Sequence, residues 1–399
     1  MTKKIKDLVK IVAVFLAIVA TVGMLGSLFS RNDGEDVETF FDNSPITDET
    51  ESTAISNEST ESSTKAAESS TEAPEETTEA SDPDFFAIDP APGLYESGSN
   101  YSTLVMSWDD LVANGAVVVS NGVATPGDNI PAGDLAFPND GSVTTLSMDS
   151  VQNKRWNTLT GIFISDAITS IRDSAFEGCV NLNHAVIGGG IATFGTRAFS
   201  LCSTLQRVYL SAGVKSIPFE CFSSCSSLAQ IHTESLAAFC KIGCSNQGHL
   251  FVNNFTSLYV DGQPITDLVI PDSLTEIGNY LFSGCDTIES ISIGDNLSSC
   301  GAYTFASCSA LETVKMSSGS FGLGTFDSCS AIKVFDLSGC TSVLTIFSEY
   351  YPPCTGTSTI YVPADLYDEW IAAEYWCDIA DRIVAVEDGQ VPAYLNELN

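Results

Sequence analysis

Residues 267–314 read DLVIPDSLTEIGNYLFSGCDTIESISIGDNLSSCGAYTFASCSALETV, and this stretch writes one pattern of residues twice. Each copy places an apolar residue, a Phe, a Cys and a second apolar residue at fixed intervals. The two copies are Ile277, Phe282, Cys285, Ile288 and, 23 residues later, Cys300, Phe305, Cys308, Leu311. A unit this short cannot bury its own apolar face, so the pattern predicts a solenoid in which successive units stack.

The same phase is found on both sides of that stretch. The further copies are Ile171, Phe176, Cys179, Leu182; Phe194, Phe199, Cys202, Leu205; Ile217, Phe222, Cys225, Leu228; and Phe326, Cys329, Ile332. After each copy, a pattern such as Leu205-x-x-Val208-x-Leu210 predicts a short strand whose alternate residues point into the core. A constant period of this length is typical of leucine-rich repeats.

The repeated unit resembles the BspA-like, or Treponema-type, leucine-rich repeat, whose pattern is roughly L-x-x-V-x-I-P-x-x-V-T-x-I-G-x-x-A-F-x-x-C. The resemblance covers about residues 130–386, and the segments 93–123 and 360–376 are similar to the caps of such proteins. It implies an α/β-type solenoid, a leucine-rich-repeat stack of short parallel strands with small capping segments at both ends. For function, it implies display on a bacterial surface.

The N-terminus carries the signal for membrane attachment. Four Lys residues precede an uncharged run at residues 11–29, which is close to the ~20 residues that span a bilayer as a helix. Positive charge keeps the N-terminal side cytoplasmic, so we expect a single-pass protein of the cell membrane with its C-terminal domain extracellular. A cleaved signal peptide is the alternative, although the apolar run is longer than the usual core of such peptides.

Changes of composition, together with the family resemblance, divide the chain into five parts. Residues 43–82 contain 17 Ser or Thr and 11 Asp or Glu, a composition typical of a disordered stalk; an acidic binding tract or an O-glycosylated tract is the alternative. The predicted parts are 1–32, a basic tip and signal anchor; 33–84, the stalk; 85–134, an N-terminal cap; 135–358, the repeats with an insertion at 232–264; and 359–399, a C-terminal cap.

Both caps have recognisable elements. In the N-terminal cap, residues 108–112 predict one or two helical turns and residues 116–119 a strand. In the C-terminal cap, residues 359–363 predict a last strand, and the amphipathic pattern of residues 364–375 predicts a helix with Trp370 on its apolar side. Such segments would shield the two ends of the repeat core from water.

The chain has 13 Cys, which in an exported protein ordinarily indicates disulfides. Most of them keep the repeat phase, so we predict a column of buried, reduced thiols that behave as small apolar residues. Two pairs, Cys240 with Cys244 and Cys354 with Cys377, stay open as alternatives.

The insertion contains the elements of a tetrahedral zinc site. His232, Cys240, Cys244 and His249 lie within 18 residues of one another. However, Cys240 belongs to a predicted helix at residues 235–242 and Cys244 closely follows it, and His232 falls on the outward side of a strand. We therefore predict no metal site and no cofactor.

Composition and motifs also exclude classes of function. A net charge of −35 argues against nucleic acid, because phosphate binding requires clustered Lys and Arg. The chain has no nucleophile elbow, no phosphate-binding glycine loop and no zinc-protease motif, so we do not predict an enzyme.

Solenoids bind partners on the extended faces of their sheets. In strand register, the outward positions include aromatic and basic residues, and the candidate binding residues are Phe163, His184, Arg207, Tyr209, Gln230, His232 and Lys315. The family resemblance implies an adhesin whose partner is an extracellular protein or glycoprotein, from the host matrix or from another microbe. The alternatives are a structural component of the cell envelope, a carbohydrate-active protein, or a solvated face without a ligand.

Overall fold

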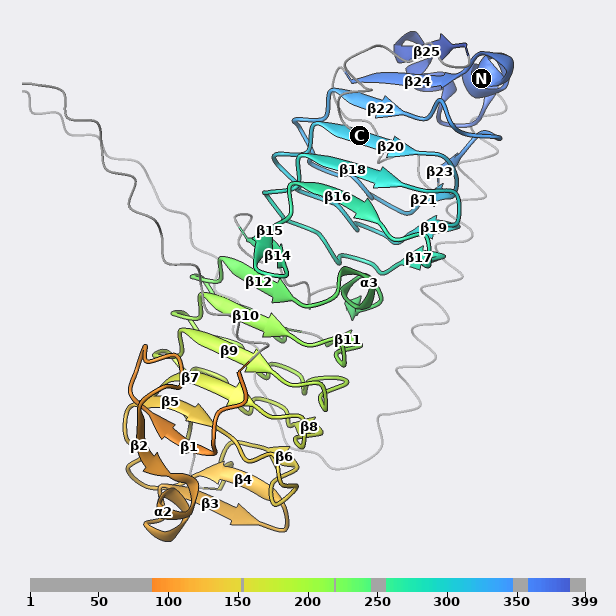
Figure 1. Cartoon of the computed structure of the whole chain (residues 1–399). Coiled ribbons are helices and arrows are strands. Elements are labelled where there is room, and N and C mark those ends of the chain that lie inside the picture. The colour runs from red at the N-terminus through yellow and green to blue at the C-terminus, as the bar shows by residue number, and fades with distance from the viewer. Residues whose placement is uncertain (1–87, 152–153, 219, 245–255, 347–357, 388–399) are drawn as a thin grey trace, which may run out of the picture. The chain divides into compact units, whose positions relative to one another are not determined.

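The computed structural model describes residues 88–151, 154–218, 220–244, 256–346 and 358–387 (Figure 1). The predicted membrane segment at residues 11–29 and the predicted stalk at residues 33–84 lie outside these ranges. Within the described ranges, no helix combines the length and the apolar character needed to cross a membrane.

The described chain coils into a solenoid whose turns each add one strand to a main sheet (Figure 1). The first main sheet has nine strands, in the order β15-β14-β12-β10-β9-β7-β5-β1-β2. In chain order they are β1 (Gly93–Tyr95), β2 (Leu104–Ser107), β5 (Gly133–Ala136), β7 (Leu159–Ile164), β9 (His184–Ile187), β10 (Arg207–Leu210), β12 (Gln230–Thr233), β14 (Ser257–Val260) and β15 (Gln263–Pro264). The strands from β5 to β14 are parallel, as the repeat pattern predicts.

A second main sheet has six parallel strands, in the order β16-β18-β20-β22-β24-β25. These are β16 (Asp267–Ile270), β18 (Ser290–Ile293), β20 (Thr313–Met316), β22 (Val334–Asp336), β24 (Thr359–Pro363) and β25 (Ile383–Val386). The sequence predicts β24 at its observed bounds, whereas β25 was not predicted.

Shorter strands close each turn on the other side of the coil. They are β3 (Val117–Ser120), β4 (Val123–Pro126), β6 (Thr145–Leu146), β8 (Ser170–Ile171), β11 (Ser216–Ile217), β13 (Gly243–Cys244), β17 (Glu276–Ile277), β19 (Ser299–Cys300), β21 (Ser320–Phe321) and β23 (Thr345–Ile346). Most of them have only two residues, because one buried apolar side chain per turn is enough to close the coil.

The repeated apolar residues fill the space between the two rows of strands, which we call the main core. Consecutive Phe rings stack in it, with centroids 5.1 Å apart for Phe176 and Phe199 and 5.4 Å apart for Phe199 and Phe222. Phe282 and Phe305 repeat this contact at 5.3 Å. The Phe residues that recur every 23 positions in the sequence are therefore the ones that pack on one another in the core.

The predicted burial of the thiol column is confirmed. The Cys202 thiol donates a hydrogen bond to the carbonyl oxygen of Phe176 at 3.1 Å, and Cys225 does the same to Phe199 at 3.1 Å. Among the cysteines of the described ranges, only Cys377 is exposed. A thiol suits this corner because it is small and still satisfies a backbone carbonyl.

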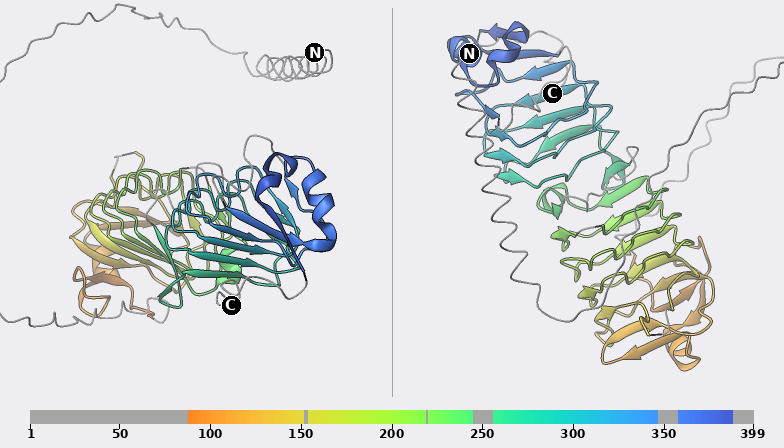
Figure 2. Two further views of the ribbon diagram at one scale, coloured as in Figure 1. Left: turned by 90° about the horizontal axis from the view of Figure 1, so that it is seen from above. Right: turned by 180° about the vertical axis from the view of Figure 1, so that it is seen from behind.

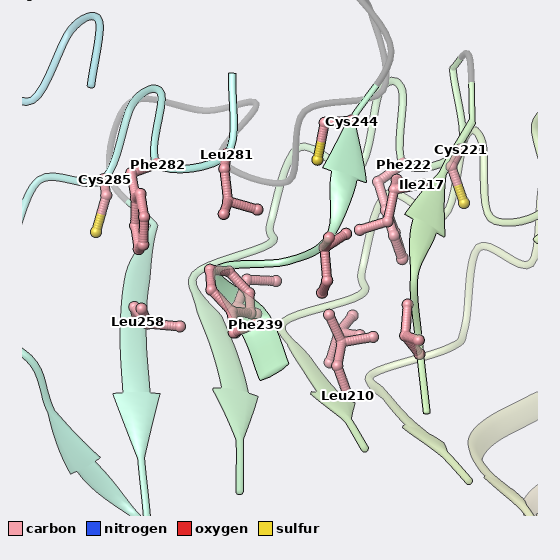
Figure 3. Close-up of a cluster of buried hydrophobic side chains, with 14 of the residues drawn as sticks. Leu210, Ile217, Cys221, Phe222, Phe239, Cys244, Leu258, Leu281, Phe282 and Cys285 are labelled. Carbon is pink, nitrogen blue, oxygen red and sulfur yellow. The ribbon is translucent and has the colours of Figure 1, made fainter. Parts of the chain in front are cut away.

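Of the residues predicted as an insertion, those described in strands β12, β13 and β14 belong to the coil. Helix α3 (Leu236–Phe239) has only four residues, shorter than predicted, because Gly243 and Cys244 instead pair with β11 as strand β13. Figure 3 shows Phe239 in the main core, on the side toward Phe282, and the two ring centroids are 5.6 Å apart.

A hairpin then ends the first main sheet. Strands β14 and β15 are joined by Asp261 and Gly262, both with positive φ, as in the tight two-residue turns that suit hairpins. Pro264 lies on the outer strand and cannot donate to a further strand, so the sheet stops there and β16 begins the second one.

Non-repeat elements close both ends of the described solenoid (Figure 2). Helix α2 (Trp108–Ala113) begins at Ser107, whose side chain accepts a hydrogen bond from the Asp110 amide, close to the prediction. At the other end, the predicted helix at 364–375 is divided into the 3-10 helix η2 (Ala364–Leu366) and α4 (Tyr367–Ala372). Ala373, whose backbone is extended, ends α4 earlier than predicted, and the 3-10 helix η3 (Cys377–Arg382) then leads into β25.

Candidate binding face of the nine-stranded sheet

The strand register aligns the outward side chains of the nine-stranded sheet in two columns. We call this side of the sheet, which points away from the main core, the strand face. One column is Ala136, Phe163, Val186, Tyr209, His232 and Tyr259; the other is Asp134, Gly161, His184, Arg207, Gln230 and Ser257. Six of the seven predicted binding residues therefore belong to one face, as their register predicts.

The N-terminal cap covers the first part of this face. Tyr101 lies over His184 and Phe163, with ring centroids 5.7 Å away from each, and its hydroxyl is 3.1 Å from His184 Nε2. Together with Ile88 and Phe163, a small apolar group forms that is separate from the main core, which we call the face cluster: Tyr95, Tyr101, Ala136, Val186 and Tyr209. His184 is only 5% exposed as a result, because the cap lies over this outward position of the sheet.

A missing side chain makes room for His184. A Cβ on Gly161 would lie 2.2 Å from His184 Cε1 and 2.9 Å from Asp134 Oδ1. Asp134 is itself fully buried, and it accepts hydrogen bonds from the Thr160 hydroxyl at 2.6 Å and from the Gly98 amide at 3.2 Å. Burial, and secondarily the charge of Asp134, raise the pKa of Tyr101 well above its usual value, so its hydroxyl stays protonated.

Farther along the face, three rings form a stack. His232 lies between Tyr209 and Tyr259, with centroid distances of 4.3 and 4.6 Å and nearly parallel planes. Gln230 connects this stack to the other column, because its Oε1 is 3.1 Å from His232 Nε2 and its Nε2 donates to the Tyr259 hydroxyl at 3.4 Å.

Stacking also hides two of the predicted residues. Tyr209 is 2% exposed and His232 is 4% exposed, so they face outward but offer little free surface. Phe163, Arg207, Gln230 and Tyr259 are half-buried. Sequence reasoning missed Tyr259, although the alternation of Leu258, Tyr259 and Val260 indicates a strand, because that stretch was assigned to an insertion.

Lys315 does not belong to this group of residues. It lies on β20 of the six-stranded sheet, is exposed, and has Ser292 and Asp336 as its neighbours in register. The two sheets thus carry different residues: the first has a run of rings beside Arg207, whereas the Lys315 column of the second reads Val269, Ser292, Lys315, Asp336 and Tyr361.

The residues weighed as zinc ligands are not brought together. His232 belongs to the strand face, whereas Cys240 and Cys244 are buried in the main core, and His249 lies outside the described residues. Over the described ranges, no cluster of three or more His, Cys, Asp or Glu side chains could hold a metal ion.

A groove of about 370 Å³ crosses the strand face near the carboxyl ends of β7, β9, β10 and β12. Its lining includes Ile88, Phe163, Ser165, Val186, Ser211 and Glu234. Ile88 and Asp89 contribute the N-terminal cap's side of this lining.

Comparison with solved structures gives several bacterial leucine-rich-repeat proteins. The leucine rich repeat protein of T. pallidum is 20% identical, with 53% of this chain and 82% of that chain covered and a TM-score of 0.30. A leucine rich cell surface protein of Faecalibacterium prausnitzii is 17% identical over 71% of this chain and 95% of its own, with a TM-score of 0.31. The pneumococcal vaccine antigen PcpA is 13% identical over 75% and 98%, with a TM-score of 0.26.

Comparison with curated proteins gives no match. The BspA type leucine rich repeat region, by contrast, matches residues 149–247 and 256–368 in six copies, together more than half of the chain. These matched residues include the repeats that build both main sheets. The chain therefore belongs to the BspA type leucine-rich-repeat family.

Proposed function

We propose that the protein is a bacterial surface recognition protein that binds an extracellular protein or glycoprotein through the strand face. The observation that supports this most is the gathering of Arg207, Gln230 and Tyr259 around the Tyr209–His232 stack. Aromatic and Arg side chains carry a large share of the binding energy in protein interfaces. Only 16 of the 399 residues are Lys or Arg, so a cation beside stacked rings is a distinctive feature of this surface.

We propose the same attachment that the sequence predicts. Residues 11–29 would anchor the chain in the cell membrane, and the acidic stalk would carry the repeats outward. A partner on the host matrix or on another microbe would then meet the strand face. The proposal requires no cofactor, metal or chemical step.

The test is a binding screen with the full-length chain against an array of matrix glycoproteins and of host and bacterial glycans. Replacing both Arg207 and Tyr259 by Ala should weaken the binding found by about tenfold or more, because both are half-buried on the strand face. Tyr209 and His232 are poor choices for this test, since removing a packed ring also costs stability.

The matched control replaces Lys315 and Tyr361 by Ala. These two residues belong to one register column of the six-stranded sheet. This variant should bind as the parent does. Loss of binding in the control alone would move the site to the six-stranded sheet. An array without any hits, combined with self-association of the chain, would instead support a structural role in the cell envelope.

A further inference from the structure

The groove on the strand face combines an apolar floor with acidic walls. Phe163 and Val186 belong to the floor, and Asp89, Asp166 and Glu234 contribute three carboxylates, whereas no described Lys or Arg lines the groove. All three acidic residues are exposed, and none of them forms an ion pair with another described residue. The groove therefore offers negative charge that the described chain itself does not neutralise.

Two of these carboxylates are held in place by the backbone of a neighbouring turn. Asp166 Oδ1 accepts a hydrogen bond from the Gly189 amide at 2.6 Å, and Glu234 Oε1 accepts one from the Ala212 amide at 3.0 Å. Each of these hydrogen bonds uses one oxygen of the carboxylate. The other oxygen can accept a hydrogen bond from a ligand.

Residues with little or no side chain leave the space between the two carboxylates open. Gly188 and Gly189 follow β9, Ser211 follows β10, and all three line the groove. A Cβ on Gly189 would have only one neighbour within 4 Å, Asp166 Oδ1 at 3.5 Å. The resulting volume of about 370 Å³ is that of a small ligand site, which suits a few side chains of a partner.

The strand register sets the distance between the two held carboxylates. Asp166 follows β7, and Glu234 follows β12, which lies three strands farther along the sheet. Neighbouring strands are ~4.8 Å apart, so the separation is ~14 Å. An extended peptide rises ~3.4 Å per residue and turns alternate side chains to one side. Its residues i and i+4 are therefore also ~14 Å apart and point the same way, with residue i+2 between them.

We propose that the groove binds an extended segment of a partner protein that has Lys or Arg at positions i and i+4 and an apolar residue at i+2. The two cations would meet Asp166 and Glu234, and the apolar side chain would cover Phe163 and Val186. Lys and Arg suit such a groove because their stems pack on apolar surface while their charged heads reach outward. The inference deepens the proposed function and rests on it for the claim that the partner is a protein.

The test uses the full-length chain and three fluorescein-labelled peptides, with binding followed by fluorescence anisotropy. The sequence Ser-Lys-Ser-Leu-Ser-Lys-Ser should bind saturably, and the same peptide with Glu in place of both Lys should not bind. A third peptide, with its two Lys only two residues apart, should bind severalfold more weakly. Absence of saturable binding by the first peptide, or equal binding by the first and either of the others, would overturn the proposal.

A charge-removing variant locates the binding. Asp166→Asn with Glu234→Gln keeps the oxygens that accept from the backbone but removes both charges, so the first peptide should bind about tenfold more weakly. The matched control is Asp173→Asn with Asp295→Asn, because these exposed carboxylates also accept a hydrogen bond from a neighbouring turn but do not line the groove. The control should bind as the parent does. Equal weakening in both variants would mean attraction to the acidic chain as a whole, which contradicts a site in the groove.

A second variant fills the groove without changing its charge. Gly189→Leu should weaken binding of the first peptide at least tenfold, while the urea midpoint of unfolding stays as in the parent, because its Cβ meets no close neighbour. Unchanged peptide binding in this variant would contradict the position of the site.

The peptide titration separates this inference from the proposed function. Arg207 and Tyr259 do not line the groove, so replacing both by Ala should leave binding of the first peptide unchanged. An array partner that this double variant no longer binds, combined with no binding of the peptide, would overturn the groove inference alone. A peptide that binds as expected, combined with an array without hits, would support the groove and count against the proposed function.

Discussion

The contact between the cap and the repeats depends on single residues. Gly161 leaves the space in which the His184 ring lies, and His184 in turn meets the Tyr101 hydroxyl from the cap. These residues belong to three different segments of the chain. Their arrangement shows why a position without a side chain can be as important to the strand face as an aromatic one.

Gly161→Ala should therefore destabilise the protein by about 1–3 kcal/mol, because the new methyl group overlaps the imidazole and the Asp134 carboxylate. Urea unfolding of the full-length variant measures this. Gly243→Ala is the matched control, since the nearest atom to its added Cβ would be 3.8 Å away, and it should cost less than ~0.5 kcal/mol. Equal stabilities of the two variants would contradict this account of Gly161.

The direction of these side chains could be predicted from the sequence, but their exposure could not. Strand alternation places His184, Tyr209 and His232 on the outward side, and they do lie there. Their burial depends on Tyr101, which is 83 residues before His184, and on rings contributed by neighbouring turns. No local pattern encodes a contact across that separation.

At the scale of the elements, the stack of Phe rings joins one turn to the next. Phe199 has the rings of Phe176 and Phe222 on its two sides. Phe194 contacts the same stack edge-on, at 6.0 Å from Phe199, at a position where other turns carry Ile171, Ile217 or Ile277. The two Phe residues thus have different roles within one turn.

Replacing each of these residues by Ile should separate the two roles. Phe199→Ile loses two stacked contacts and leaves a cavity, so we expect a cost of roughly 2–3 kcal/mol. Phe194→Ile introduces the residue found in neighbouring turns and should cost less than ~1.5 kcal/mol. Thermal and urea unfolding check both values, and a larger loss for Phe194→Ile would show that the edge contacts matter more than the stack.

The sequence predicts the repeated elements better than the irregular ones. Phase alone indicates β10, β18 and β20, because each buried residue recurs at a fixed step and packs on its equivalent. Helix α3 and strand β25 depend instead on how a turn closes against its neighbour. Cys244 fits the strand position of Ile217, and that pairing shortens the helix.

At the scale of the molecule, four of the buried thiols share one electrostatic property, a raised pKa. Burial raises the pKa of Cys240, Cys244 and Cys300 from 9.0 to about 12, and that of Cys285 to about 11. Below pH 9 these thiols are protonated in both the folded and the unfolded chain. Between pH 9 and about 12 they ionise only when the chain unfolds, so alkaline pH favours unfolding.

The free energy of unfolding should therefore fall from pH 8 to pH 10 by up to ~1.4 kcal/mol per pH unit above 9 for each such thiol, in the presence of reductant. Four thiols would remove ~5 kcal/mol by pH 10, a large part of the stability of an ordinary domain. Urea titrations at both pH values measure the fall.

Two single substitutions test whether the thiols cause that fall. Cys300→Ala should make it smaller by about 1 kcal/mol, because one buried thiol is gone. Cys377→Ala, which removes an exposed thiol, should leave it unchanged. A parent protein equally stable at pH 8 and pH 10 would contradict the role assigned to burial.

Turns that carry Phe, Cys and Ile at the same positions pack in the same way, so the number of turns can change without a change in how they pack. Deleting residues 180–202 would join the turn of Phe176 directly to that of Phe222, with ring again on ring and thiol again on thiol. In the main core, turns away from the junction pack only on their own neighbours, so such a change leaves their packing as it was. Recombination between repeats of the gene can then lengthen or shorten the strand face while the fold is retained.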